Sequence, residues 1–300
     1  MKIVLAGGTG FVGRTLTKEL EKSGHEIFIL TRNVSQRKNT EAITYVSWLE
    51  KGNHPEEILE GIDAFINLAG ESINSGRWTE SRKKKILDSR LSATREALRI
   101  LRRLNKKPHV FINASAIGYY GTSFTKTFTE KSSEKGEDFL ATTVQQWEVE
   151  ALKARDMGIR TICSRFGIIL DQTDGALPRI ALPYKLFAGG TVGSGEQWVS
   201  WIHLKDVVNG LLYALENEEL EGPVNFTSPY PVSMKEFGKS LGQILHRPHW
   251  IPAPSFALRA VLGEMSLLIL EGQKVLPTKL KEKGYPFLFE KLQDALKDIY

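Results

Sequence analysis

The feature that most constrains this fold is a run of glycines that begins a few residues into the chain. An apolar segment at residues 3–5 leads into Ala-Gly-Gly-Thr-Gly-Phe-Val-Gly at residues 6–13, and a helical pattern follows to residue 22. Glycines spaced in this way permit a tight turn, close approach of the backbone to a pyrophosphate, and close packing of helix on strand. The helix start offers free N–H groups to phosphates. The segment therefore predicts a dinucleotide site at Gly7, Gly8, Thr9, Gly10, Phe11, Val12 and Gly13.

Apolar runs and helical patterns alternate through the first half of the chain. Further strands are predicted at residues 26–30, 64–68, 110–114 and 161–170, with helices at residues 79–104 and 147–156. This alternation is typical of a parallel sheet with helices on both faces. The sequence therefore predicts an α/β protein with a doubly wound Rossmann fold that binds NAD(P).

The second half of the chain is richer in glycine and proline, which interrupt regular elements. Residues 177–197 and 248–254 have this character, and the tail from residue 255 predicts two or three helices. We expect a Rossmann domain at residues 1–170, to which residues 203–228 return. A smaller C-terminal substrate lobe is expected from residues 171–202 and 229–300.

Composition and charge argue against several classes of protein. Apolar residues make up 41% of the chain and charged residues 25%, which is compatible with a sizeable core. The net charge of +5 is scattered, and the one tight run, residues 83–85, lies in a helical pattern, so nucleic acid is not expected as a partner. No stretch approaches the roughly 20 apolar residues of a membrane span, and the N-terminal apolar stretch is too short for a signal peptide. We expect a cytoplasmic protein without a membrane partner.

Cysteine and histidine give no sign of metal or covalent chemistry. The single cysteine, Cys163, lies in an apolar segment and is expected to be a buried strand thiol. His246 and His249 are separated by an arginine and a proline, which prevents a regular helical pair of ligands, and no third ligand is evident. We therefore expect a surface loop at these histidines and no metal.

The end of the second predicted strand indicates which dinucleotide binds. Proteins that bind NAD usually carry an acidic residue here, which holds the ribose 2′-hydroxyl. This chain has Thr31 and Arg32 instead, and a guanidinium can hold a 2′-phosphate through two parallel hydrogen bonds. The alternative is an exposed loop arginine. The third apolar run ends in Leu68, Ala69 and Gly70, which either let the cofactor approach the backbone or belong to the core. The cofactor is therefore expected to be NADP(H).

Further motifs resemble the extended short-chain dehydrogenase/reductase superfamily. They are Ala-Ser-Ala at residues 114–116 with Tyr-Gly at 120–121, Arg-Phe-Gly at 165–167, and Trp-Ile-His-Leu-Lys-Asp at 201–206. The chain resembles most closely that superfamily's epimerase-like NADP-binding branch, through Asn-Leu-Ala-Gly-Glu at 67–71, Gly-Ser-Gly-Glu-Gln-Trp at 193–198, Leu-Gly-Glu-Met at 262–265 and Glu-Gly-Gln-Lys-Val-Leu-Pro at 271–277. The resemblance covers essentially the whole chain. It implies an NADP site built from the glycine loop, Thr31, Arg32, Leu68 and Ala69, together with Arg90 and the backbone near Ile168.

The resemblance also implies a catalytic tyrosine with a lysine four residues later, and this sequence lacks both. In the superfamily, the lysine and the oxidised nicotinamide lower the tyrosine pKa, so that the tyrosine can move a proton. The corresponding stretch, residues 138–146, contains neither residue type. Ser115 stands where the resemblance implies a hydroxyl that polarises the substrate oxygen. Tyr120 matches a structural tyrosine of the superfamily, and we interpret it as a pocket wall.

Two classes of function therefore remain open. An NADP(H)-dependent oxidoreductase or nucleotide-sugar epimerase-like enzyme would use an unconventional acid–base group on a small-molecule substrate, either a nucleotide sugar or a carbonyl compound. A non-catalytic NADP(H)-binding sensor or regulatory protein would need only the glycine loop. Residues 189–197, with Trp198 and Trp201, either edge the substrate pocket or hold the smaller lobe against the larger one.

Overall fold

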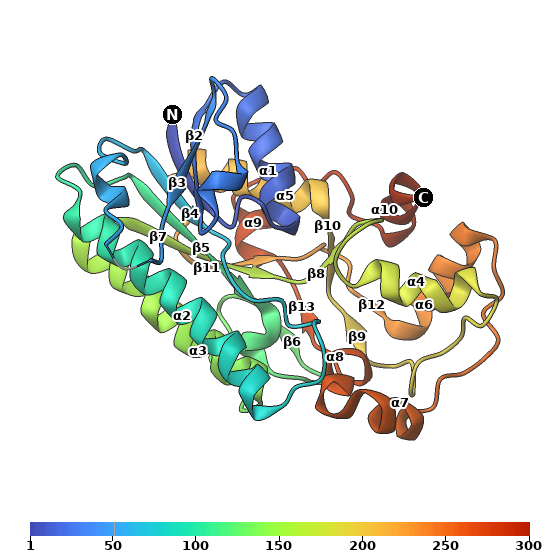
Figure 1. Ribbon diagram of the computed structural model, residues 1–300. Helices are drawn as coiled ribbons and strands as arrows, with labels where there is room; N and C mark the ends of the chain where they lie inside the picture. The colour runs from blue at the N-terminus through green and yellow to red at the C-terminus, as the bar shows by residue number, and fades with distance from the viewer. Residues whose placement is uncertain (51) are drawn as a thin grey trace.

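Seven strands form a central sheet in which every neighbouring pair is parallel (Figure 1). The computed structural model describes residues 1–50 and 52–300. Across the sheet the strands are β11 (Gly222–Phe226), β7 (Arg160–Phe166), β5 (Val110–Ala116), β4 (Ala64–Asn67), β1 (Lys2–Ala6), β2 (Glu26–Thr31) and β3 (Ile43–Ser47). The chain winds outward in both directions from β1, so the carboxyl ends of β1 and β4 form the switch point where ligands bind in such folds.

Helices cover both faces of the sheet, because alternate residues of a strand point to opposite sides. Ile3 and Leu5 of β1 share a buried cluster with residues of α1 (Phe11–Lys22) and α5 (Leu204–Glu216). Val4 and Ala6 share the opposite cluster with residues of α2 (Glu80–Arg103) and α3 (Phe139–Leu152). The predicted doubly wound α/β fold is therefore confirmed. The two edge strands, β3 and β11, were not predicted from the sequence.

The start of α3 differs from the prediction. The helix begins at Phe139 rather than at residue 147, and the 3-10 helix η4 (Lys153–Met157) follows it. The side chain of Asp138 accepts hydrogen bonds from the backbone N–H groups of Leu140 and Ala141 at 2.8 and 3.1 Å. Because an aspartate at this position satisfies donors that the first helical turn leaves free, it fixes the helix start.

The strand predicted at residues 161–170 is two strands separated at Gly167. The first, β7, belongs to the main sheet, whereas β8 (Ile168–Leu170) pairs with β10 (Trp201–His203). A Cβ added at Gly167 would lie 2.4 Å from the carbonyl oxygen of Ser200. Glycine at position 167 allows the chain to pass close to Ser200 as it leaves the main sheet and enters β8, which pairs with β10.

A further buried cluster lies beside the main sheet. Residues of α4 (Leu177–Lys185), α6 (Met234–Leu245) and α10 (Leu292–Ile299) pack there around the fully buried Trp201. These three helices lie together at one end of the molecule in Figure 1. Two further strand pairs tie distant segments together: β9 (Trp198–Val199) with β12 (Val232–Ser233), and β6 (Thr127–Phe128) with β13 (Lys274–Val275).

The tail contains four α-helices, where two or three were predicted: α7 (Ser255–Leu262), α8 (Leu267–Leu270), α9 (Thr278–Glu282) and α10. Leu280 and Tyr285, which the sequence analysis assigned to the smaller lobe, pack in the cluster of the main sheet. The short 3-10 helices are η1 (Val34–Gln36), η2 (Pro55–Glu57), η3 (Ile117–Tyr120) and η5 (Gly263–Ser266). Within residues 1–50 and 52–300, no helix combines the length and the apolar character that crossing a membrane requires.

Candidate functional site

The glycine loop joins β1 to α1 at the carboxyl edge of the sheet. Gly7 has a φ of +80°, and a Cβ there would lie 2.8 Å from the backbone carbonyl carbon of Leu68. A Cβ at Gly13 would lie 2.1 Å from the carbonyl oxygen of Gly7. Both positions therefore need glycine for the fold itself, before any ligand is considered.

Gly10 is different, because the fold leaves space around it. It is exposed, and a Cβ there would meet only the carbonyl oxygen of Gly7, at 3.2 Å. Gly10 precedes α1 without any side-chain hydrogen bond to the first turn. The first N–H groups of a helix have no partner within the helix. The start of α1 can therefore donate to an anion, and glycine at position 10 allows that anion to lie against the backbone.

The end of β2 provides a positive charge beside this loop. Thr31 is partly buried, and its hydroxyl oxygen accepts a hydrogen bond from the N–H of Asn33 at 3.2 Å. Arg32 is exposed, and no ion pair among residues 1–50 and 52–300 involves it. Arg14, on the first turn of α1, instead forms an ion pair with Asp174. Arg32 is thus free to meet an anionic group on a ligand.

The turn after β4 forms the next part of this edge. Leu68 and Ala69 are partly buried, and the N–H of Ala69 donates to Oδ1 of Asn67 at 3.2 Å. The amide of the Asn67 side chain donates in turn to Asn113 on β5 at 2.7 Å. These buried bonds fix the turn beside the glycine loop. Ile168, which starts β8, lies just beyond the carboxyl end of β7.

Arg90 packs beneath the same turn. A Cβ at Gly70 would lie 3.4 Å from Cγ of Arg90, whose guanidinium donates to the carbonyl of Glu71 at 3.1 Å. The guanidinium carbon also lies 5.1 Å from the ring centroid of Trp147. Burial lowers the pKa of Arg90 to about 10, which keeps its positive charge at neutral pH. Arg90 and residues 68–70, both expected from the resemblance, are thus neighbours.

Ser115 lies near the end of β5 with its hydroxyl directed into the protein. The hydroxyl donates to Oε1 of Glu148 at 2.5 Å, and Ser115 is only 3% exposed. Glu148 also accepts two hydrogen bonds from Arg165, each of 2.7 Å. Although burial opposes the charge, these bonds raise the pKa of Arg165 above its ordinary value. This geometry does not support the expectation that Ser115 polarises a substrate oxygen, because the hydroxyl is already bonded to a buried carboxylate.

Two tyrosines lie against the guanidinium of Arg165. Its carbon lies 3.6 Å from the ring centroid of Tyr119 and 4.8 Å from that of Tyr120. The Tyr120 hydroxyl donates to Asn225 at 2.9 Å, and burial raises the pKa of Tyr120 to about 12. Tyr120 therefore stays protonated at neutral pH. Its buried ring stacks on Phe128 and belongs to the interior rather than to a pocket wall.

The resemblance implies a tyrosine and a lysine on α3, and the spacing to Glu148 would put them at positions 140 and 144. The chain has Leu140 and Val144 there, one turn apart. Leu140 is partly buried beside Gly118, whose Cβ would lie 3.7 Å from that of Leu140, and Val144 is buried. Neither side chain can exchange a proton.

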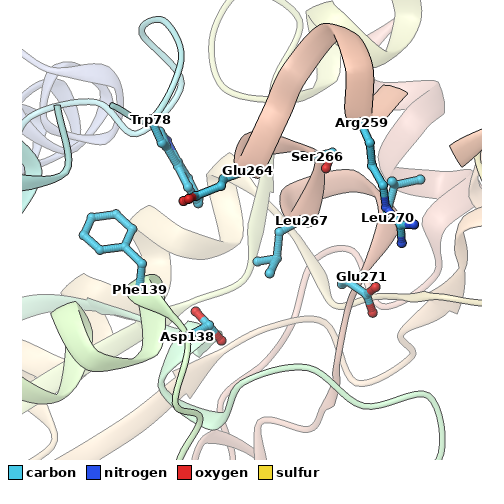
Figure 2. Close-up of a pocket in the computed structure, with 9 residues that line it drawn as sticks. All are labelled: Trp78, Asp138, Phe139, Arg259, Glu264, Ser266, Leu267, Leu270 and Glu271. Atoms are coloured by element: carbon cyan, nitrogen blue, oxygen red, sulfur yellow. The ribbon is translucent and has the colours of Figure 1, made fainter. Parts of the chain in front are cut away.

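A cleft of about 340 Å³ opens between the start of α3 and the tail of the chain (Figure 2). Trp78, which precedes α2, meets Phe139 edge to face on one side, with the ring centroids 5.5 Å apart. Asp138 lies below them, and the tail forms the other side with Arg259, Glu264, Ser266, Leu267, Leu270 and Glu271. This cleft was not predicted from the sequence, because its lining comes from segments far apart along the chain.

The segment at residues 189–197 does not line this cleft. Gln197 is fully buried and donates to the carbonyls of Val192 and Ile269 at 3.0 and 2.7 Å. The indole of Trp198 donates to the carbonyl of Phe124 at 2.9 Å, which ties two distant segments together, as the alternative interpretation expected. Trp201 is instead buried within the cluster of α4, α6 and α10.

The side chains of His249 and Cys163 contact other parts of the protein. Nδ1 of His249 lies 2.8 Å from the Tyr184 hydroxyl, and Nε2 lies 3.1 Å from that of Thr191. Across the described part of the chain, no three His, Cys, Asp or Glu side chains are grouped so that they could hold a metal ion. Cys163 is a buried strand thiol, as expected, and burial raises the pKa of this thiol.

Comparison with known families gives two matches along the chain. Residues 3–226 match the NAD dependent epimerase/dehydratase family. Residues 253–299 match a domain of unknown function, DUF1731, and this region contributes the tail side of the cleft.

Similar proteins match over the full length. The epimerase family protein YfhF of Bacillus subtilis (strain 168) is 50% identical over 301 residues, which span 100% of this chain and 98% of YfhF. The crystal structure of the human epimerase family protein SDR39U1 (isoform 2) with NADPH has a TM-score of 0.88 at 32% identity, and covers 100% of this chain and 99% of that chain. UDP-glucuronic acid 4-epimerase from Bacillus cereus, solved with UDP-glucuronic acid and NAD, shares the fold, with a TM-score of 0.80 at 17% identity over 100% and 98% of the two chains.

Proposed function

The chain belongs to the NAD-dependent epimerase/dehydratase family, and we propose that it is an NADP(H)-dependent, epimerase-like oxidoreductase that works without the tyrosine–lysine pair of its superfamily. One observation carries the cofactor assignment. An exposed arginine, Arg32, without an ion pair among the described residues, follows β2 beside a glycine loop whose helix start is open to an anion. The NADPH bound by SDR39U1 supports the same assignment by similarity.

The space around the three glycines of the loop supports dinucleotide binding. Gly7 and Gly13 are held close to backbone atoms, whereas Gly10 is open above the start of α1. The pyrophosphate would lie against Gly10 and accept hydrogen bonds from the N–H groups of Phe11 and Val12. Thr31 and Arg32 would hold the 2′-phosphate. Leu68, Ala69 and the backbone near Ile168 would flank the nicotinamide half, which supplies a carbon that exchanges hydride.

A group outside α3 must then donate or accept the proton during the reaction. Leu140 and Val144 cannot donate or accept a proton, and Tyr120 keeps its proton because its pKa is about 12. Positioned acid–base groups contribute about 10²–10⁴ in rate. Slow turnover therefore follows unless the substrate or water supplies the proton.

The apolar side chains of Leu140 and Val144 favour a second candidate function, that of an NADP(H) sensor without turnover. A sensor of NADP(H) needs the loop and Arg32 but no group at Leu140 or Val144. Consumption of NADPH across a panel of carbonyl compounds and nucleotide sugars separates the two. Turnover above the uncatalysed rate would support the enzyme, and NADPH binding without turnover of any compound in the panel would favour the sensor.

A crystal structure of the chain with NADPH tests the cofactor assignment. The proposal expects the pyrophosphate within hydrogen-bond distance of the N–H groups of Phe11 and Val12, and the 2′-phosphate on Arg32. A dinucleotide bound elsewhere, or a 2′-phosphate that contacts solvent alone, would overturn it.

A further inference from the structure

We infer that the cleft between α3 and the tail selects compact, largely apolar carbonyl compounds that carry no phosphate, and excludes nucleotide sugars. That the ligands are carbonyl compounds rests on the proposed function. Their size and apolar character are inferred from the residues that line the cleft, shown in Figure 2.

The cleft adjoins the start of α3, where the resemblance implies the catalytic tyrosine. Asp138 and Phe139 line the cleft, and Leu140, the position that the spacing to Glu148 implies for that tyrosine, is the next residue along α3. The carbonyl group of a bound molecule would lie at this end, and the rest of the molecule would lie toward Leu267 and Leu270.

One wall offers only apolar ring surface. The indole N–H of Trp78 already donates to the carbonyl of Ile73 at 2.9 Å, and Trp78 is 8% exposed. Phe139 packs against it edge to face. Leu267 and Leu270 form apolar surface on the tail side. Such a lining favours an aromatic or aliphatic body, since apolar pockets bind by burying apolar area.

The charges of the lining oppose a diphosphate. Asp138, Glu264 and Glu271 carry carboxylates, and Arg259 is the single cationic side chain among the described residues that line the cleft. Diphosphate recognition needs arginine, lysine or free backbone donors. Two backbone N–H groups at the start of α3, those of Leu140 and Ala141, already donate to the side chain of Asp138.

Three basic residues beside the cleft are engaged within the protein, whereas Arg259 in the lining itself has no ion pair among residues 1–50 and 52–300. Lys83 pairs with Glu264 at 2.5 Å and with Glu80 at 3.2 Å. Arg77 donates to the carbonyl of Val261 at 2.8 Å, and Arg82 pairs with Glu71 at 2.9 Å. These bonds tie the residues before and within α2 to the tail and to the turn after β4, so these cations are not free to bind phosphates.

The size of the cleft also favours a small ligand over a nucleotide sugar. Its volume of about 340 Å³ is at the small end of the range for small-molecule pockets, roughly 300–1,000 Å³. A nucleotide sugar must place a base, a ribose, a diphosphate and a hexose. A single-ring ketone or aldehyde needs far less room.

Binding to the full-length chain tests the inference, with acetophenone and benzaldehyde as probes against UDP-glucose and UDP-glucuronic acid. Saturation-transfer NMR detects weak binding, and the indole N–H resonance of Trp78, assigned with Trp78→Phe, reports contact with the cleft wall. The inference expects the aromatic carbonyls to bind and to shift that resonance, and the UDP-sugars to leave it unchanged.

Two variants localise the binding. Leu267→Arg adds bulk and charge inside the cleft and should reduce carbonyl binding about tenfold or more, whereas Val261→Arg, at an exposed position on α7 outside the lining, should not. Equal binding to Leu267→Arg, no binding of either carbonyl, or a shift of the Trp78 resonance by a UDP-sugar would overturn the inference. These measurements need no cofactor. Failure of NADPH to bind would therefore count against the proposed function alone.

Discussion

The hydroxyl of Ser115 donates to Glu148, 2.5 Å away, although the two residues lie on different elements, β5 and α3. The same carboxylate is held by two hydrogen bonds from Arg165 on β7. One buried cluster thus joins two neighbouring strands to the helix that packs on them. A residue that the resemblance implied would act on substrate is thus held inside a buried polar cluster.

Removal of the carboxylate should destabilise the protein. Glu148→Ala leaves Arg165 charged and buried without its partner, a loss that typically costs about 3–5 kcal/mol. Ser115→Ala removes one hydrogen bond and should cost less, about 1–3 kcal/mol. Urea unfolding at neutral pH measures both, with exposed Glu137→Ala as the control. A Glu148→Ala variant as stable as the unmodified chain would show that the cluster contributes nothing to the fold.

Two glycines of the loop should respond differently to the same substitution. Gly10→Val should fold but lose NADPH, because its side chain extends into space left free by the protein, where we place the pyrophosphate. Gly13→Val should fail to fold stably, since even a Cβ there would lie 2.1 Å from the Gly7 carbonyl oxygen. Circular dichroism and calorimetric titration check both. Normal NADPH affinity in a folded Gly10→Val protein would refute the loop assignment.

Arg32 should discriminate between the two dinucleotides. Arg32→Asp should weaken NADPH binding by about 1.5–3 kcal/mol, the usual contribution of a hydrogen bond to a charged group, and leave NADH binding unchanged. Lys18→Asp, an exposed position further along α1, makes the same change in net charge and is the control. Equal weakening in both variants would attribute the effect to overall charge rather than to a 2′-phosphate contact.

The sequence predicted much of the sheet and of the nucleotide loop, because these depend on local patterns. Glycine spacing and apolar runs can be recognised in the sequence without knowing which segments pack against them. The orientation of Ser115 was not readable, since it depends on Glu148 and Arg165. The cleft escaped prediction for a similar reason: Trp78, Phe139 and Leu267 are far apart along the chain and meet only in the folded protein.

Buried His203 should make the protein lose stability as the pH falls. Burial lowers the pKa of His203 to about 4, against the opposing charge of Asp298. The unfolded chain, with a histidine pKa of about 6.5, binds its proton first as the pH falls. The stability is therefore full above about pH 6.5 and is lost toward pH 4, with about 2 kcal/mol gone by pH 5.

His203→Asn isolates this contribution, because asparagine can still accept the hydrogen bond that Nδ1 of His203 receives from the N–H of Lys205. Urea unfolding of both proteins at pH 7 and pH 5 should show a smaller loss in the variant. The same loss in both would mean that other groups set the acid sensitivity.

Calorimetric titration of the unmodified chain with NADPH and with NADH tests the central claim most directly. The open start of α1 and Arg32, which has no ion pair among residues 1–50 and 52–300, predict saturable binding of one NADPH per chain. We expect this binding to be at least about tenfold tighter than that of NADH, a difference of about 1.4 kcal/mol. No binding of NADPH, or equal affinity for the two dinucleotides, would contradict the claim that this loop is an NADP(H) site.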